Sequence, residues 1–247
     1  MSNVIARRQL SLDLRTWGGK RRNSGRKPKG PRALLRHCAR PRIAPSTPVH
    51  ATIRMRPEIS NLRTKDTYRV IASALAAGGE RFGLRVVHHS VQSNHIHLIA
   101  EAPDAHALGR GMQGLGIRIA RRLNALARRH GSVLADRYHT HVLRTPREVR
   151  HCLLYVLNNG RKHAAQRGVA CGPTWLDPYS SARRFDGWSP AAVTDSPPDL
   201  DPPPWVAPST WLLRTGWRRY GPLPVAEVPS RTLLVRARRA GDRRGAG

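Results

Sequence analysis

Residues 84–102 read LRVVHHSVQSNHIHLIAEA, two apolar and β-branched segments separated by a short polar stretch. The segments 84–92 and 95–102 predict two strands, because β-branched residues favour a pleated, half-buried surface. Ser93-Asn94 between them predicts a tight turn. The stretch therefore predicts a β-hairpin.

The second strand of this hairpin carries two histidines at alternate positions, His95 and His97. Alternate residues of a strand share one face, so we expect both imidazoles on the same side of the sheet. Two neutral imidazoles there can share a divalent cation with further ligands from another element. The chain has 12 histidines, and such a pair taken alone favours strand histidines that form ordinary hydrogen bonds.

The segments around the hairpin alternate between strand and helix patterns. Polar and apolar residues alternate in the strand-like segments, and apolar residues recur at helical spacing in the others. The order β-α-β-β-α-β-α predicts an α+β fold, a ferredoxin-like antiparallel sheet with the helices packed on one face. The expected strands are 48–56, 84–92, 95–102 and 136–145, and the expected helices are 64–83, 103–131 and 146–164.

The last expected helix, 146–164, carries a tyrosine among apolar neighbours. Asn159 follows Tyr155 by four residues, which puts both side chains on one helix face. If that face covers the histidines, Asn159 can supply an oxygen ligand and Tyr155 can reach a phosphate. A phenol with a pKa of ~10 is a weak nucleophile at neutral pH, so a cation that polarises the phosphate has to assist it. A buried structural tyrosine is the alternative.

Two stretches together resemble a known family: SVQSNHIHLIAEA (90–102) and ADRYHTHVLRTPREVRHCLLYVLNNGRKH (135–163). They are similar to the single-tyrosine HUH transposases, and more closely to the REP-associated tyrosine transposase branch. That family has a His-hydrophobic-His strand, a tyrosine on a later helix and an Asn or Gln one turn beyond it. The resemblance covers roughly residues 47–165.

The resemblance implies a metal-dependent reaction on single-stranded or hairpin DNA. His95, His97 and Asn159 would bind Mg²⁺ or Mn²⁺, and Tyr155 would attack the scissile phosphate. The products would be a 5′-phosphotyrosine link and a free 3′-hydroxyl, which can attack in the reverse direction. The family includes both monomers and dimers, so the resemblance does not decide the oligomeric state.

The composition is strongly basic, with 44 Lys and Arg against 15 Asp and Glu and a formal net charge of +29. A polyanion is the expected partner, because binding phosphates releases counterions. No apolar run approaches the ~20 residues of a membrane-spanning helix. Three separated cysteines favour reduced thiols, so we expect a cytoplasmic protein associated with the nucleoid.

The charge and the Pro and Gly content divide the chain into three expected parts. Residues 1–47 form a basic tail without enough apolar residues to pack. Residues 48–186 form the catalytic domain, and 187–247 form a Pro-rich linker and a basic extension, within which the apolar patch 210–221 is expected to dock onto the domain. The tails are not part of the family core, which leaves open whether the chain is active or domesticated.

Basic residues in three places are candidates for contacts with the DNA backbone. One set lies on the long helix, one flanks Tyr155, and one lies in the N-terminal tail. A merely solvated basic surface is the alternative for each set. The candidates are Arg118, Arg121, Arg122, Arg147, Arg150, Arg161, Lys162, Arg26, Lys27 and Lys29.

Other motifs are weaker. His139 and His141 form a second His-x-His, but the middle residue is polar and the strand differs from the family's metal strand. His88 and His89 are adjacent and should point to opposite faces. A literal G-x-G-x-x-G at 109–114 lies inside an expected helix rather than after a strand, so it does not predict a dinucleotide site.

Two further functions belong to other classes. One is a DNA-binding regulator that keeps the fold without the activity, and the other is a basic RNA-binding protein. The joint presence of His95, His97, Tyr155 and Asn159 favours the enzyme over both.

Overall fold

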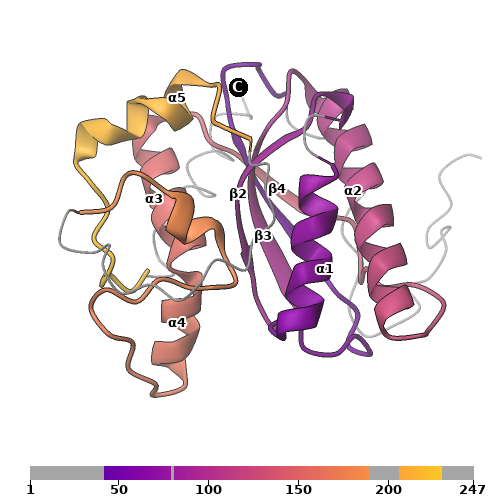
Figure 1. Cartoon of the computed structure of the whole chain (residues 1–247). Helices are drawn as coiled ribbons and strands as arrows, with labels where there is room; N and C mark the ends of the chain where they lie inside the picture. The colour runs from indigo at the N-terminus through magenta and orange to yellow at the C-terminus, as the bar shows by residue number, and fades with distance from the viewer. Residues whose placement is uncertain (1–41, 79–80, 190–205, 230–247) are drawn as a thin grey trace, which may run out of the picture. The chain divides into compact units, whose positions relative to one another are not determined.

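The computed structural model describes residues 42–78, 81–189 and 206–229 (Figure 1). Most of the expected N-terminal tail therefore lies outside the described residues. The same holds for the DNA-contact candidates Arg26, Lys27 and Lys29.

A four-stranded antiparallel sheet forms the centre of the fold. The order of its strands is β2-β3-β1-β4, so β3 and β1 lie inside and β2 and β4 at the edges. The expected element order and the α+β, ferredoxin-like sheet are confirmed. The strands are β1 (Val49–Arg54), β2 (Arg85–Val91), β3 (His95–Glu101) and β4 (His139–Val142).

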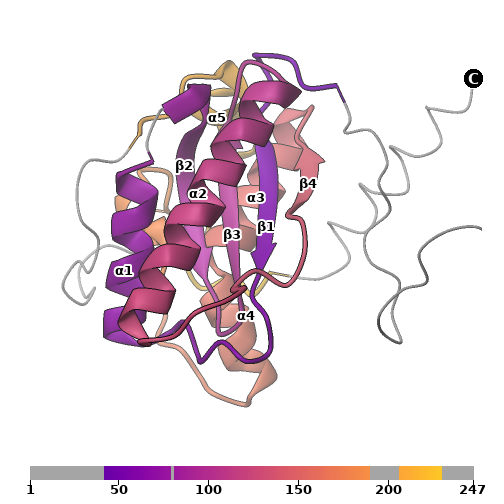
Figure 2. The same ribbon diagram turned by 90° about the vertical axis from the view of Figure 1, so that its right-hand side faces the viewer.

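Two helices, α1 (Lys65–Ala76) and α2 (Ala105–Leu126), cover one face of the sheet (Figures 1 and 2). The side chains of Thr64 and Asp104 accept hydrogen bonds from the backbone of the first turns, which caps both helices. A short 3₁₀ turn, η1 (Arg81–Gly83), precedes β2. Apolar residues of the two helices and of alternate strand positions fill the core between these layers.

The 109–114 glycine motif lies within α2, as expected, and serves packing. A Cβ added at Gly111 would stand 2.3 Å from the Cβ of Leu84. A side chain there would push α2 away from the start of β2. Gly111 therefore permits a close approach of helix and strand.

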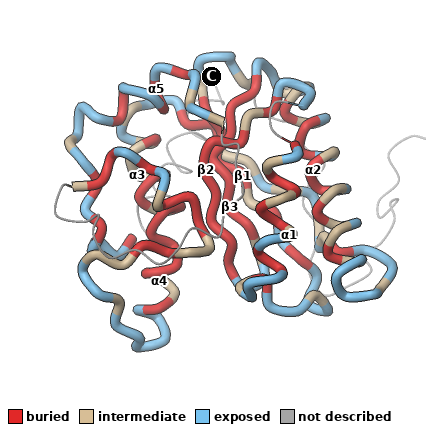
Figure 3. The backbone as a smooth tube through the Cα atoms, in the orientation of Figure 1, coloured by how far each residue is buried: buried red, intermediate tan, exposed pale blue. Residues whose placement is uncertain are grey.

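The expectation that all helices share one face is wrong for α3 (Pro146–Leu157), which packs on the opposite face (Figure 1). The strands β2 and β3 are buried along both faces (Figure 3). Their apolar residues on this second face include Val87 and Ile99, which share a core with α3. An apolar patch on each side of a sheet has to be covered, so one layer of helices is not enough.

The expected helix 146–164 is divided in two. α3 begins with a capping box. The Thr145 hydroxyl accepts from the Glu148 backbone N–H, and the Glu148 carboxylate accepts from the Thr145 backbone N–H. It ends at Leu157, Asn158 intervenes, and α4 (Asn159–Gln166) follows (Figure 2). After α4, the chain turns back through a 3₁₀ turn, η2 (Ser181–Arg184).

The C-terminal segment 206–229 packs against α3, which confirms the expected docking of the patch 210–221. It contains α5 (Trp211–Arg214) and η4 (Gly216–Tyr220), and their apolar side chains join the α3 core. The Asn158 side-chain amide donates to the carbonyl oxygens of Val225 and Glu227, both at 3.0 Å. The segment thus holds the point at which α3 gives way to α4.

Candidate functional site

The second face of the sheet becomes polar towards the C-terminal end of β1. Along β1, Ala51 and Ile53 point into the core under α1 and α2, while His50, Thr52 and Arg54 alternate with them. The cross-strand register pairs Thr52 with His97 and Arg54 with His95. The expected common face of His95 and His97 therefore also carries the polar residues of β1.

The two histidines of β3 face each other through their outer nitrogens. His95 Nε2 lies 3.1 Å from His97 Nε2. On the inner side, His95 Nδ1 is 2.8 Å from Asn94 Oδ1. His97 Nδ1 lies 3.1 Å from His50 Nε2 and 3.2 Å from Thr52 Oγ1. Each ring is therefore oriented through one nitrogen, while the other nitrogen points to a shared position.

Both imidazoles are neutral at pH 7. Burial first, and then the nearby His163, Arg54 and Lys162, lower the pKa of His95 to about 4. Burial, followed by the neighbouring His50 and His95, holds the pKa of His97 well below its ordinary value. Neutral imidazole is the form that donates a lone pair to a metal ion.

Tyr155 approaches this pair from α3. Its ring lies 5.2 Å from the ring of His97, centroid to centroid and edge-on, and 6.0 Å from that of His50. The Lys162 Nζ lies 4.7 Å from the centre of the Tyr155 ring. Lys162 of α4 therefore lies on the same side as Tyr155 although Asn158 separates the two helices. The expected meeting of Tyr155 with His95 and His97 occurs within one chain.

A cavity of about 500 Å³ opens where these elements meet. Its floor is the polar face of β1, β3 and β4, and its wall is formed by α3 and α4. None of the described residues that line it is acidic, so the cavity suits an anion. The lining residues are His50, Thr52, Arg54, His95, His97, His139, His141, Tyr155, Lys162, His163 and Gln166.

Asn159, the expected third ligand, does not line this cavity. It is fully buried, and within the described chain neither polar atom of its side chain has a hydrogen-bond partner. Asn158 interrupts the helix with φ −98° and ψ 16°, so the four-residue spacing from Tyr155 is not that of an uninterrupted helix. The role of Asn159 as a ligand stays a prediction.

The described residues contain no group of three or more His, Cys, Asp and Glu placed to hold a metal ion. The fit of a divalent cation therefore depends on His95 and His97. Two ligands on adjacent corners of an octahedral ion with bonds of ~2.1 Å lie about 3 Å apart. The 3.1 Å between the two Nε2 atoms agrees with this separation. The pair fits as two ligands of a cation whose other positions stay open.

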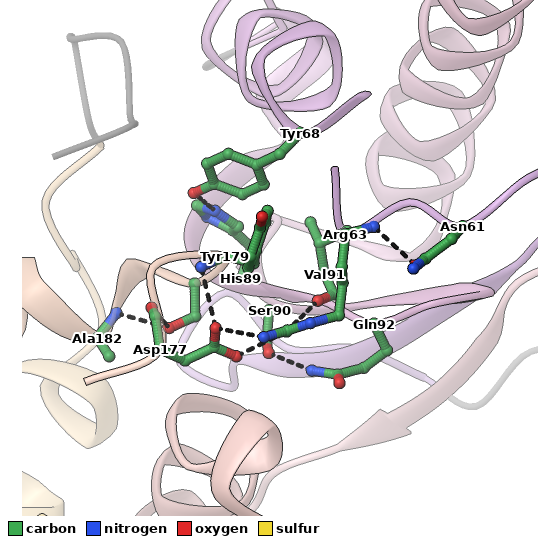
Figure 4. Close-up of polar contacts among 11 residues, drawn as sticks. Asn61, Arg63, Tyr68, His89, Ser90, Val91, Gln92, Asp177, Tyr179 and Ala182 are labelled. Atoms are coloured by element: carbon green, nitrogen blue, oxygen red, sulfur yellow. Dashed lines mark hydrogen bonds and ion pairs between the residues drawn. The ribbon is translucent and has the colours of Figure 1, made fainter. Parts of the chain in front are cut away.

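A buried ion pair supports the end of the fold that carries α4 (Figure 4). Both oxygens of Asp177 accept from the Arg63 guanidinium at 2.9 Å, and Arg63 also donates to the Val91 carbonyl oxygen at 2.9 Å. A Cβ added at Gly160 would stand 2.1 Å from Asp177 Oδ2. The pair thus joins the loop after α4, the start of α4 and the end of β2.

Several of the expected DNA contacts have other partners. The guanidinium of Arg161 donates to the carbonyl oxygens of Gly172 and Trp175, both at 2.8 Å, so it holds a loop. Arg150 donates to the Pro222 carbonyl oxygen, and Arg122 to Ser73 Oγ. The candidates Arg118, Arg121 and Arg147 do not line the cavity, and Lys162 does. Their contacts with DNA stay predictions.

The remaining histidine motifs divide into two kinds. His88 and His89 are buried, with His89 Nε2 3.1 Å from the Tyr68 hydroxyl and His88 beside Ser181. Both are therefore structural. His139 and His141 lie on the cavity face of β4, across β1 from the β3 pair.

The sequence reasoning missed His50 and His163 and treated Lys162 only as a phosphate contact. His50 could have been found from the period-two polar pattern of β1.

Among the described residues, no helix has the length and apolar character needed to cross a bilayer. No protein-family model and no curated protein matches the chain.

The solved structures that are similar to the chain include the following two. One is a REP-associated tyrosine transposase bound to a REP hairpin, with 18% identity and a TM-score of 0.47, over 61% of this chain and 84% of that one. The other is a protein of Deinococcus radiodurans R1 assigned as a transposase, with 14% identity and a TM-score of 0.35, over 57% of this chain and 100% of that one. The first belongs to the branch that the sequence resembles.

Proposed function

We propose that this protein is a metal-dependent endonuclease and strand transferase of single-stranded DNA, of the transposase kind, with Tyr155 as its nucleophile. The observation that carries the proposal is the approach of the Tyr155 ring to within 5.2 Å of His97, whose neighbour His95 shares its neutral state. A nucleophile and a pair of metal-binding nitrogens in one anion-suited cavity are what such a reaction requires.

In the proposed reaction the Tyr155 hydroxyl gives up its proton to solvent and its oxygen attacks the scissile phosphorus. The new P–O bond joins the 5′ phosphate to the tyrosine, and the broken P–O bond leaves a 3′-hydroxyl once its oxygen takes up a proton. His95 and His97 would hold the divalent cation, which would supply charge to polarise the phosphate. Lys162, beside the Tyr155 ring, is suited to stabilise the negative charge on the phosphate and the phenolic oxygen.

The charge distribution supports a nucleic acid as the substrate. The net charge of +29 and the lining by Arg54, Lys162 and histidines favour a phosphodiester over a neutral or cationic ligand. We propose DNA hairpins with single-stranded flanks as the substrate class, because the sequence resembles a hairpin-binding branch.

The test is the detection of a covalent adduct between the protein and DNA. Full-length protein is incubated with end-labelled single-stranded DNA carrying a hairpin, with Mg²⁺ or Mn²⁺ or with EDTA, and is then denatured. We expect a DNA–protein band that requires the cation and is absent in Tyr155→Phe. Tyr220→Phe, at an exposed tyrosine, is the matched control and should keep the band. An equal band in Tyr155→Phe would overturn the proposal.

A second candidate is a DNA-binding regulator on the same fold. The observation that favours it is the position of Asn159, outside the cavity, which leaves two histidines without a described third ligand. A regulator would bind the same hairpins tightly with no cation-dependent band for any variant.

A further inference from the structure

The inner nitrogen of His97 has two neighbours on β1 that can either donate or accept a hydrogen bond. His50 Nε2 lies 3.1 Å from His97 Nδ1, and Thr52 Oγ1 lies 3.2 Å from the same atom. A hydroxyl has both a hydrogen and lone pairs, and an imidazole nitrogen takes either role according to its tautomer. His97 Nδ1 is therefore satisfied whether or not it carries the hydrogen.

His95 has no such freedom. Its Nδ1 lies 2.8 Å from the side-chain oxygen of Asn94, which can only accept. The hydrogen of the neutral ring is therefore on Nδ1, and Nε2 presents a lone pair. This is the tautomer that a metal ligand needs at Nε2.

The short distance between the two outer nitrogens makes the tautomers interdependent. Two lone pairs at 3.1 Å would repel each other. Without a cation, His97 therefore carries its hydrogen on Nε2 and donates it to His95 Nε2, while its Nδ1 accepts from β1. With a cation between the Nε2 atoms, the same hydrogen has to be on Nδ1 of His97.

We infer that His50 and Thr52 are positioning residues that allow His97 to change tautomer when a cation binds between His95 and His97. The hydrogen leaves Nε2 and an equivalent one is gained at Nδ1, so His97 stays neutral and neither gains nor loses a net proton. Nδ1 then donates to Thr52 Oγ1 or to His50 Nε2, whose own hydrogen in that case is on Nδ1. This inference rests on the proposed function, because it assigns the cation to the β3 pair.

The chemistry of the β1 pair distinguishes this site from one with a carboxylate behind the ligand. A carboxylate only accepts, so it holds a histidine permanently in the ligand tautomer. It also places a charge in a buried position, which is costly when no cation is present. His50 is 8% exposed and His97 is 4% exposed, so neutral partners that serve both states suit this environment.

The direct test is nuclear magnetic resonance of the full-length protein labelled with ¹⁵N in histidine, because ring nitrogen shifts distinguish the tautomers. We expect His97 to carry hydrogen on Nε2 without a cation and on Nδ1 with saturating Mg²⁺, while His95 keeps Nδ1–H throughout. Loss of the His97 signals in His97→Gln assigns them. A His97 that shows Nδ1–H with and without Mg²⁺ would overturn the inference.

A pair of double variants tests the β1 residues by Mn²⁺ affinity. His50→Phe with Thr52→Val removes both partners of Nδ1, and we expect Mn²⁺ to bind about 10- to 100-fold more weakly. His50→Gln with Thr52→Ser keeps groups that donate or accept, and should stay within about threefold of the wild type. His106→Phe, at an exposed histidine of α2, is the distant control. If the two double variants bound Mn²⁺ with the same affinity as each other, the inference would be contradicted.

The outcome is separable from that of the proposed function, because neither measurement involves DNA. A tautomer change without any covalent adduct would leave the inference standing and remove the nuclease. A Tyr155 adduct in a protein whose His97 never changes tautomer would support the nuclease and overturn the inference.

Discussion

Two His-x-His pairs lie on the same face of one sheet, and β1 separates them. His95 and His97 of β3 have their rings held through Asn94 and β1, and their Nε2 atoms are 3.1 Å apart. On β4, His139 is exposed and His141 is half-buried. Both pairs have the His-x-His spacing, so this spacing determines only on which face of the sheet the side chains lie.

The difference comes from the place of each strand in the sheet. β3 is an inner strand with a turn residue and a neighbouring strand to orient its rings, whereas β4 is an edge strand of four residues. An edge strand has one neighbour and a side open to solvent. A metal pair needs the rigid surroundings that the inner strand provides.

The largest effect is expected from the ion pair beside the β3 hairpin. Asp177→Asn leaves the mostly buried Arg63 guanidinium without a counter-charge, which should cost about 3–5 kcal/mol of unfolding free energy in urea. Gly160→Ala should also destabilise, because its Cβ would meet Asp177, while Gly172→Ala has open space and is the control. A wild-type urea midpoint in Asp177→Asn would show that the pair does not support this half of the fold.

Alanine substitutions of one histidine in each pair distinguish the roles of the two pairs. His97→Ala should lower the rate of DNA cleavage by more than about 100-fold, because a ligand of the cation is lost. His141→Ala should lower it by less than about tenfold, since His141 lines the cavity without being assigned to the cation. Similar losses in both variants, measured in single-turnover cleavage, would erase the distinction between the strands.

Acid should weaken the fold through the neutral histidines. The pKa values of His95 and His88 are lowered to about 4 by burial, so the unfolded chain takes up protons that the folded chain does not. Stability is therefore full above pH 6.5 and falls as the pH drops towards 4, by up to about 1.4 kcal/mol per pH unit for each such histidine. Urea midpoints between pH 4.5 and 7.5 measure this slope.

The variant His95→Gln with His97→Gln removes two of these groups, so its slope below pH 6.5 should be flatter than that of the wild type. An unchanged slope would mean that the β3 pair is protonated in the folded protein.

The smallest effect is expected at the turn. Asn94→Ala removes the acceptor that fixes the tautomer of His95, and Mn²⁺ affinity should fall about tenfold. Asn61→Ala, whose side chain accepts from the Arg63 backbone outside the cavity, is the matched control. Stronger Mn²⁺ binding by Asn94→Ala would contradict the assigned hydrogen bond.

The local patterns predicted the sheet well. Alternation located β1 and β3, and turn and capping residues located the hairpin and the start of α3, because these signals are local in the chain. The second helical layer was not predicted, because β2 and β3 are apolar on both faces and such runs do not say which helix covers which face.

The site was predicted in part for the same reason. The approach of Tyr155 to His97 follows from motif order, and the alternation of β1 puts His50 on the polar face. The contact of His50 with His97 depends on the register of β1 against β3, which no local pattern contains. The position of Asn159 depends on the interruption at Asn158, whose side chain is held by carbonyl oxygens nearly seventy residues later in the sequence. Such long-range contacts are absent from any short window of sequence.

The central claim is that Tyr155, beside the β3 pair, is the residue that becomes joined to DNA. The most direct measurement is mass spectrometry of the proteolysed adduct formed by the full-length protein with hairpin DNA and Mn²⁺. We expect a nucleotide phosphate on the peptide that contains Tyr155, and none when His95 and His97 are both replaced by glutamine. A phosphate on any other residue, or DNA cleavage without a linked peptide, would contradict it.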